Sequence, residues 1–226
     1  MVKTWVISLG GSRIVPGQVD VKFLREFKSL INSHKSYKFV VVTGGGITAR
    51  KYIVALRKMG KGPSVQAREG IAITRHHAKF MTRYFGKNTN DEIPMTMKQV
   101  KNMLVKNQVV FSGSLRYKPN NTTDGTAATL AGYLGCPFIN LTNVKGLYTS
   151  DPTKNKNAKF VPKISWIDFD KIVSKIKFQN GQHFVLDQRA SKTIKKKKIS
   201  TYIVGTLMSI DNIIKNKKFV GTLIEG

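Results

Sequence analysis

The sequence predicts an α/β fold in which a mostly parallel sheet is covered by helices on both faces. Short apolar, β-branched runs alternate along the chain with segments of helical periodicity. Three of these runs, Trp5–Leu9, Phe39–Val42 and Phe138–Leu141, have the length of buried strands, and a glycine-containing turn follows each of them closely. Strands that alternate with helices usually pair in parallel through right-handed crossovers.

The first half of the chain is expected to begin with the strand Trp5–Leu9. Asp20 is placed to cap a helix whose apolar residues recur with helical spacing. Further elements follow in order: the strand Phe39–Val42, a helix from Ile47 or Thr48 to about Met59, a break at Lys61–Ser64, a helix from Glu69 to about Phe85, a helix at Met97–Lys106, the strand Val109–Phe111 and an exposed loop at Leu115–Asn121.

The second half continues the alternation. Asp124 is expected to begin a helix of small residues that packs closely on the sheet, and the polar stretch Tyr148–Phe160 disfavours helix. The other expected elements are the strand Phe138–Leu141, helices at Trp166–Ile176, Gln188–Lys197 and Ile210–Ile214, and strands at Ser200–Val204 and Gly221–Ile224.

The length of 226 residues fits one domain, 1–226, made of two closely joined lobes. No apolar run approaches the roughly 20 residues that a membrane span requires, and the N-terminus lacks a signal-peptide pattern. A cytoplasmic protein without a membrane partner is therefore expected. The single cysteine, Cys136, has no partner for an internal disulfide and is expected to be a small buried residue.

The chain is strongly basic, with 39 Lys and Arg against 12 Asp and Glu and a formal net charge of +27. Such an excess attracts polyanions and phosphorylated small molecules alike. The lysines are spread along the chain, and aromatic residues in an RNA-recognition spacing are absent. A solvated basic surface is therefore favoured, and nucleic acid is a possible partner that is not favoured.

Glycine-containing turns carry most of the functional information. A glycine after a strand lets backbone N–H groups approach an anion, and a following helix points its positive end at the same place. The turns are Leu9–Ser12, Thr43–Gly46, Thr122–Gly125 and Asn143–Gly146. Neither the Walker nor the Gly-x-Gly-x-x-Gly pattern is present, and the four histidines form no metal or catalytic set. A phosphate-binding crevice of another architecture is indicated.

In order, these turns and their neighbours resemble the motifs of the amino acid kinase family, most closely its archaeal-type uridylate (UMP) kinase branch. The resemblance covers essentially the whole chain. The matching blocks are Leu9–Ser12, Gly44–Tyr52, Gly70–Arg75, Thr122–Asp124, Thr142–Pro152 and Asp187–Lys192.

The resemblance implies a three-layer αβα sandwich and ATP-dependent phosphorylation of UMP to UDP, a step of pyrimidine nucleotide synthesis. It implies an acceptor-binding lobe at about 1–135, an ATP-binding lobe at about 136–226, and a homohexamer. Magnesium would come with ATP and be held mainly by its oxygens, because the sequence shows no dedicated cluster of carboxylates.

The resemblance also assigns roles to individual residues. Catalytic roles fall to Lys192, Asp124 and Arg50. ATP-binding roles fall to Gly10, Gly11, Ser12, Gly46, Arg50, Thr142, Asn143, Tyr148 and Asp151. UMP-binding roles fall to Gly45, Thr122 and Thr123.

Each assignment has a structural alternative. Gly10 and Gly11 could simply form a turn, and Asp124 could be a helix N-cap. Arg50 and Lys192 could be solvated surface residues.

Four positions depart from the family pattern. Ser8 stands where many members have a catalytic lysine, and Ala67 stands where an acid holds the acceptor ribose. Lys145 and Gln188 replace an aspartate and a proline.

These departures leave two other functions open. The same fold could act on another small phosphate such as isopentenyl phosphate, although relatives of that kind usually have a histidine within the segment that is Ile47–Arg50 here. A degenerate kinase that binds nucleotide or RNA is the other possibility.

Overall fold

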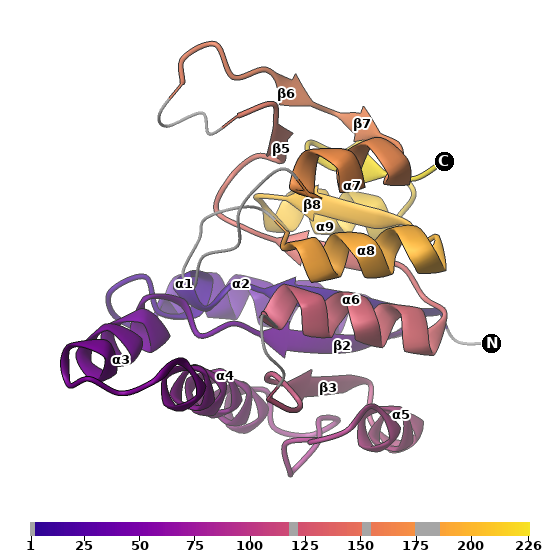
Figure 1. Ribbon diagram of the computed structural model, residues 1–226. Helices are drawn as coiled ribbons and strands as arrows, with labels where there is room; N and C mark the ends of the chain where they lie inside the picture. Colours follow the sequence, from indigo (N-terminus) through magenta and orange to yellow (C-terminus); the bar gives the residue numbers. More distant parts are fainter. Residues whose placement is uncertain (1–2, 118–121, 151–154, 175–185) are drawn as a thin grey trace.

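The computed structural model describes residues 3–117, 122–150, 155–174 and 186–226. Within these ranges the strands form a seven-stranded sheet in the order β3-β2-β1-β4-β8-β9-β7 and a two-stranded sheet β5-β6 (Figure 1). The strands are β1 (Lys3–Leu9), β2 (Tyr37–Thr43), β3 (Val109–Ser112), β4 (Phe138–Leu141), β5 (Leu147–Tyr148), β6 (Phe160–Val161), β7 (Lys163–Ile164), β8 (Thr201–Val204) and β9 (Thr222–Ile224).

The strand directions confirm the mostly parallel sheet. β3, β2, β1, β4 and β8 pair in parallel. β9 is antiparallel to β8, and the edge strand β7 pairs in parallel with β9. The carboxyl ends of the five parallel strands therefore meet at one edge of the sheet, where α1 and the ends of α3 and α4 lie (Figure 1). Ligands of open parallel sheets bind at this edge.

Helices cover both faces of the sheet. They are α1 (Gly11–Ile14), α2 (Val21–Ser33), α3 (Gly46–Lys58), α4 (Pro63–Phe85), α5 (Met97–Lys106), α6 (Thr123–Leu134), α7 (Trp166–Ser174), α8 (Gln188–Lys197) and α9 (Leu207–Ile214). Apolar residues of α2, α4 and α9 form the core on one face, and those of α5, α6, α7 and α8 form the core on the other. The three-layer αβα arrangement is therefore confirmed. α3 packs on α4 beside the sheet.

The register of β1 decides which of its side chains face each layer. Ile7 and Leu9 lie in the core with α2 and α9, and Val6 lies in the core with α6. Because side chains alternate along a strand, Ser8 points to the α6 side of the sheet. Ser8 pairs with Val42 of β2 and Asn140 of β4, so it lies at the centre of the sheet.

Several expected boundaries are wrong for identifiable reasons. α4 begins at Pro63, six residues before the expected Glu69, because proline at the first helical position loses no hydrogen bond. Leu115, expected in an exposed loop, is buried. The two-residue strands β5, β6 and β7 are too short to show a period in the sequence. Of the expected elements, residues 118–121, 151–154 and 175–176 lie outside the described ranges.

Three further expectations were tested at single residues. Asp20 does cap α2, since its carboxylate accepts a hydrogen bond of 2.9 Å from the Phe23 amide. His34, which was expected to have no obvious partner, has its Nε2 2.9 Å from Oδ1 of Asp211 on α9. Cys136 is only partly buried, although burial raises the pKa of its thiol to about 12. No helix in the described ranges combines the length and apolarity needed to cross a membrane.

Candidate active site

The glycine turns after β1 and β2 interlock at the carboxyl edge of the sheet. The Gly44 amide donates to the Leu9 carbonyl over 2.8 Å. A Cβ on Gly11 would lie 2.4 Å from the Gly44 carbonyl oxygen and 2.4 Å from the Gly46 amide nitrogen. Gly46 itself has φ +57, which side chains rarely adopt. Close backbone contacts therefore require glycine at positions 11 and 46, beyond the formation of a tight turn.

Side chains from α4 and the end of β2 fix the second glycine turn. His77 Nδ1 lies 2.7 Å from the Gly44 carbonyl, which makes this nitrogen the protonated one. The Thr43 hydroxyl donates to the Thr74 carbonyl over 2.8 Å, and the Thr74 hydroxyl accepts from the Ser114 amide over 3.0 Å. Burial lowers the pKa of His77, with a smaller opposing contribution from its bond to Gly44. His77 therefore acts here as a neutral positioning residue.

Arg50 lies on the first turns of α3, next to the interlocked glycines. Its guanidinium reaches Ser12 Oγ at 3.5 Å, so the structure brings these two expected site residues together. Arg50 is half-buried. A half-buried guanidinium beside two glycine turns is suited to bind phosphate with two parallel hydrogen bonds.

Asp124 lies in the first turn of α6 and faces β1. Its Oδ1 accepts a hydrogen bond of 2.7 Å from the Ser8 hydroxyl. Burial raises the pKa of Asp124 from 3.8 to about 7; the Ser8 bond opposes this shift and the charge of Asp187 adds to it. The interpretation of Asp124 as a helix N-cap is wrong, because Thr122 caps α6 by accepting from the Gly125 amide over 3.2 Å.

Thr122 and Asp187 join the N-termini of α6 and α8. The Thr122 hydroxyl donates to Asp187 Oδ2. Asp187 Oδ1 caps α8 by accepting from the amides of Arg189 and Ala190 over 2.7 and 2.8 Å. Two positive helix ends therefore lie side by side at the carboxyl edge, with two carboxyl groups close by. Thr123, the first residue of α6, is partly buried beside them.

Lys192 lies further along α8 with an exposed side chain. The pKa of Asp170 on α7 is below its ordinary value. Burial raises this pKa, but hydrogen bonds from Lys195 and Ser191 and the charges of Lys195 and Lys192 lower it by more. The five residues from the cap Asp187 to Lys192 place the lysine about one and a half turns from the helix end.

The expected ATP-binding residues after β4 form a second wall of the edge. Thr142 is partly buried and its hydroxyl lies 3.3 Å from Asn143 Oδ1, while Asn143 is exposed. The Tyr148 ring contacts Phe160 edge to face at 5.6 Å. Lys145, one of the departures from the family pattern, lies over the Phe160 ring at 5.1 Å. Asp151 lies outside the described ranges.

A pocket of about 370 Å³ opens between α4 and the loop after β3. It is lined by Arg68, Ile71 and Arg75 of α4 and by Tyr117 of the loop after β3. The Arg68 guanidinium lies 5.8 Å from the Tyr117 ring centre. The lining residue Ile71 directly follows Gly70, whose carbonyl oxygen would lie 3.6 Å from a Cβ built on Gly45 of the second glycine turn.

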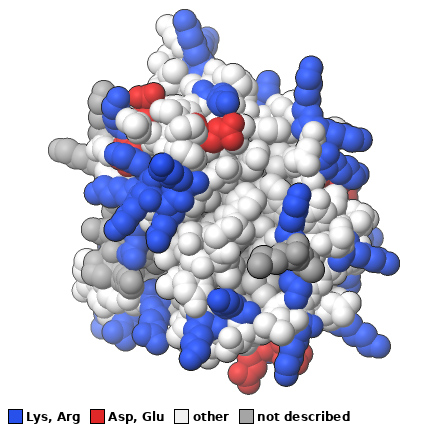
Figure 2. Space-filling model, turned by 90° about the vertical axis from the view of Figure 1, so that its right-hand side faces the viewer, with Lys and Arg blue, Asp and Glu red and all other residues white. Residues whose placement is uncertain are grey.

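Figure 2 shows the face of the molecule away from the carboxyl edge, where Lys and Arg side chains are widespread and Asp and Glu appear in only a few places. Among the described residues, no group of three or more His, Cys, Asp or Glu side chains could hold a metal ion.

Sequence reasoning missed several residues that build the site. Asp187 was recognised only as part of a motif. Its place directly before a helical pattern is typical of an N-cap, so its capping role could have been predicted. Ser8 could have been placed on the α6 side by counting alternate residues along the strand. Arg68 and Tyr117 gave no signal, because their meeting depends on how the loop after β3 packs on α4.

Comparison with known proteins adds an independent line of evidence. The profile of the amino acid kinase family matches residues 3–205. The chain is 32% identical to the uridylate kinase of Pyrococcus abyssi over 225 residues, which covers 97% of this chain and 98% of the relative. It is 31% identical to the uridylate kinase of Thermoplasma volcanium over 227 residues, covering 100% and 99%.

Solved structures agree with the sequence comparison. The crystal structure of uridylate kinase from Archaeoglobus fulgidus superposes with a TM-score of 0.85 at 33% identity, covering 97% of this chain and 99% of that one. The UMP kinase of Bacillus anthracis shares the fold with a TM-score of 0.83 at 20% identity, covering 99% and 96%.

Proposed function

The chain belongs to the amino acid kinase family, and from this we propose that it transfers the γ-phosphoryl group of ATP to UMP, giving ADP and UDP. The observation that carries the proposal is that 97% of the chain matches archaeal uridylate kinases at about a third identity. The geometry of the carboxyl edge supports the same reaction, because two interlocked glycine turns present backbone donors at one place.

The acceptor side is proposed to be formed by the second glycine turn and α6. Gly45 would contact the phosphate of UMP, and Thr122 and Thr123 would lie against the nucleotide. The pocket between α4 and Tyr117 supports this, since its lining residue Ile71 follows Gly70, which packs against Gly45. Its arginines offer N–H donors and its tyrosine offers an aromatic face, which suit the carbonyl groups and ring of a pyrimidine.

The donor side is proposed to be formed by the first glycine turn and the loop after β4. Gly10, Gly11, Ser12 and Gly46 would bind the phosphates of ATP. The adenine and ribose would lie against a second set of residues, which are Thr142, Asn143, Tyr148 and Asp151.

The phosphoryl group would move between the two glycine turns. Phosphoryl transfer has a loose transition state with charge spread over the equatorial oxygens, so it needs positioning and cations. Arg50 lies 3.5 Å from Ser12 and would bind the moving group. Lys192 would neutralise the developing charge, and Asp124 would orient the cations around it.

Magnesium is proposed to arrive bound to ATP. The described residues fit an ion that comes with its substrate, because they offer the Asp124 carboxyl beside Asp187 without a third ligand. When bound, the ion would supply charge neutralisation at the phosphate oxygens, and Asp124 would face it.

The organisation of the protein follows from this proposal. Residues of about 1–135 would form the acceptor lobe and those of about 136–226 the ATP lobe. We propose that the protein works as a homohexamer in the cytoplasm, where its nucleotide substrates are.

A coupled assay of ADP release tests the activity. Purified protein with ATP and magnesium is expected to turn over UMP at least ten times faster than CMP, AMP or isopentenyl phosphate. Release of ADP with isopentenyl phosphate and not with UMP would show that the acceptor is wrong. No ADP release with any acceptor, together with RNA binding that weakens steeply as salt rises, would favour the degenerate kinase instead.

A further inference from the structure

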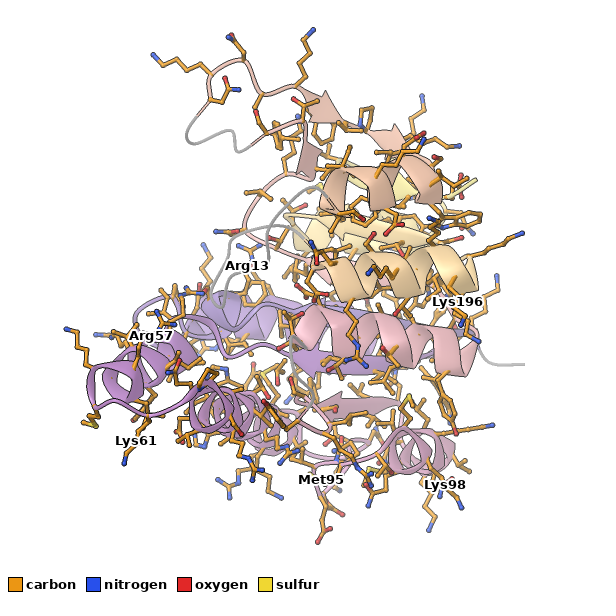
Figure 3. The ribbon with its side chains drawn as sticks, viewed as in Figure 1. Arg13, Arg57, Lys61, Met95, Lys98 and Lys196 are labelled. Carbon is orange, nitrogen blue, oxygen red and sulfur yellow. The ribbon has the colours of Figure 1, made fainter. Side chains whose placement is uncertain are left out.

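We propose that Arg13 is a phosphate-binding residue of the ATP subsite, so that its guanidinium binds the phosphates between the ribose and the transferred group. This inference rests on the proposed function and adds to it a residue that lies outside the sequence motifs. Arg13 follows Ser12 directly, in α1. Figure 3 shows it at the carboxyl edge of the sheet, between α1 and the C-terminal part of the molecule.

The position of Arg13 joins the two walls of the proposed ATP subsite. Its backbone belongs to the first glycine turn, since its amide donates to the Gly10 carbonyl over 2.8 Å. Its guanidinium reaches across to the carbonyl of Gly205, directly after β8. Gly205 in turn packs on the loop after β4, where a Cβ would lie 2.7 Å from the Val144 carbonyl. The guanidinium therefore lies between the loop proposed to bind phosphates and the loop proposed to bind adenosine.

The hydrogen bonding of Arg13 is incomplete. Its Nε is buried and has no hydrogen-bond partner among the described residues. A buried donor without a partner is unfavourable, and in native proteins it commonly marks a group that awaits a ligand, ion or water. An anionic oxygen that arrives with a ligand would complete the bonding of this N–H.

The surroundings of Arg13 hold it in place without neutralising it. Its guanidinium lies over the Phe23 ring, 5.0 Å from the ring centre, which fixes one face. Burial lowers the pKa of Arg13, and the charge of Asp20 partly restores it. No ion pair joins Arg13 to a carboxylate within the described ranges. A fixed, charged and unpaired guanidinium is suited to a phosphate.

Competition binding on the full chain tests this role. A fluorescent ATP analogue is displaced in turn by ADP and by adenosine, for the wild type and for Arg13→Met. Because charge-assisted hydrogen bonds are strong, the variant is expected to bind ADP about 10-fold or more weakly, with adenosine affinity within about 2-fold of wild type. The ratio of the two affinities separates phosphate binding from general damage to the subsite.

Two further variants serve as controls. Arg25→Met on α2 removes the same charge from an exposed position and is expected to leave the ratio unchanged. Arg13→Lys keeps the charge but loses Nε and is expected to give an intermediate ratio. If Arg13→Met does not fold, Arg13→Lys and Arg13→Gln provide the same comparison.

The results divide cleanly. A selective loss of ADP affinity supports the proposal. An unchanged ratio, including one in which ADP and adenosine weaken together, overturns it and leaves Arg13 a structural bridge to Gly205. Neither result depends on UMP, so a failure of the UMP kinase assay is a separate outcome.

Discussion

The hydroxyl of Ser8, at the centre of the sheet, donates a hydrogen bond of 2.7 Å to Oδ1 of Asp124, in the first turn of α6. This contact ties the strand before the first glycine turn to the helix proposed to face UMP. It also holds a carboxyl group in a place where burial and the nearby Asp187 raise its pKa to about 7. A group that titrates near neutral pH in an enzyme site can respond to the charge of its ligands.

Asp124→Asn is expected to change the pH dependence of stability. The folded pKa of Asp124, about 7, lies above its ordinary value of 3.8. Its contribution to stability is therefore fully present below pH 3.8 and is lost as pH rises through 7. Asparagine does not titrate and can still accept from Ser8. Relative to that of the wild type, the free energy of unfolding of the variant should rise by on the order of 3 kcal/mol between pH 4 and pH 8.

Urea unfolding of both proteins across this pH range measures the difference. Parallel curves of stability against pH would show that Asp124 does not titrate in the folded protein. The same variant is expected to lower kcat by about 100-fold or more, because the amide cannot orient the cations at the transferring phosphate. A variant with wild-type kcat would remove Asp124 from the mechanism.

Lys192→Ala is expected to lower kcat by about 100-fold while the free energy of unfolding stays within about 0.5 kcal/mol of wild type. Lysine at this site would neutralise charge in the transition state, and its exposed side chain contributes little packing. Lys196→Ala is the matched control, because Lys196 is an exposed lysine of the same helix, labelled in Figure 3. Equal rates for the two variants would assign Lys192 to the solvated surface.

Gly11→Ala is expected to abolish measurable turnover. The added Cβ would lie 2.4 Å from the Gly44 carbonyl and the Gly46 amide, so the two glycine turns would have to separate. Gly17→Ala provides the control, since a Cβ there meets nothing within 4 Å. Initial rates with ATP and UMP are the readout, and circular dichroism confirms folding. A folded Gly11→Ala enzyme with near-normal kcat would show that the close approach of the turns is not needed.

Arg68→Met and Tyr117→Ala are expected to raise the KM for UMP about 5- to 10-fold and to leave the KM for ATP unchanged. Both side chains line the pocket beside Gly45, on the acceptor side. Arg57→Met, at an exposed arginine of α3 labelled in Figure 3, should change neither constant. An increase in the KM for ATP alone would show that this pocket belongs to the ATP site and that UMP binds elsewhere.

The sequence was enough to identify the fold because each main strand is followed closely by its turn signal. Trp5–Leu9, Phe39–Val42 and Phe138–Leu141 all lie within strands of the parallel sheet. Helices with a strong apolar period, such as Met97–Lys106 and Gln188–Lys197, have the expected ends. The early start of α4 was missed because Pro63 marks a break as readily as a first helical turn.

The candidate site was only partly accessible from the sequence. Glycine turns can be found by their spacing, but that Gly11 touches Gly46 depends on two loops that lie 35 residues apart in the chain. The raised pKa of Asp124 depends on burial and on Asp187, which is brought near by the packing of α6 on α8. Electrostatic environments of this kind arise from tertiary packing and leave no local pattern.

The binding of a bisubstrate ligand tests the central claim most directly. P1-(5′-adenosyl)-P5-(5′-uridyl) pentaphosphate joins the two proposed nucleotides through one phosphate chain. If the glycine turns bind both nucleotides in one crevice, calorimetry should give one ligand per protomer and a Kd at least about 100-fold below that of ADP, because the second contact becomes intramolecular. An affinity no better than that of ADP would contradict the account.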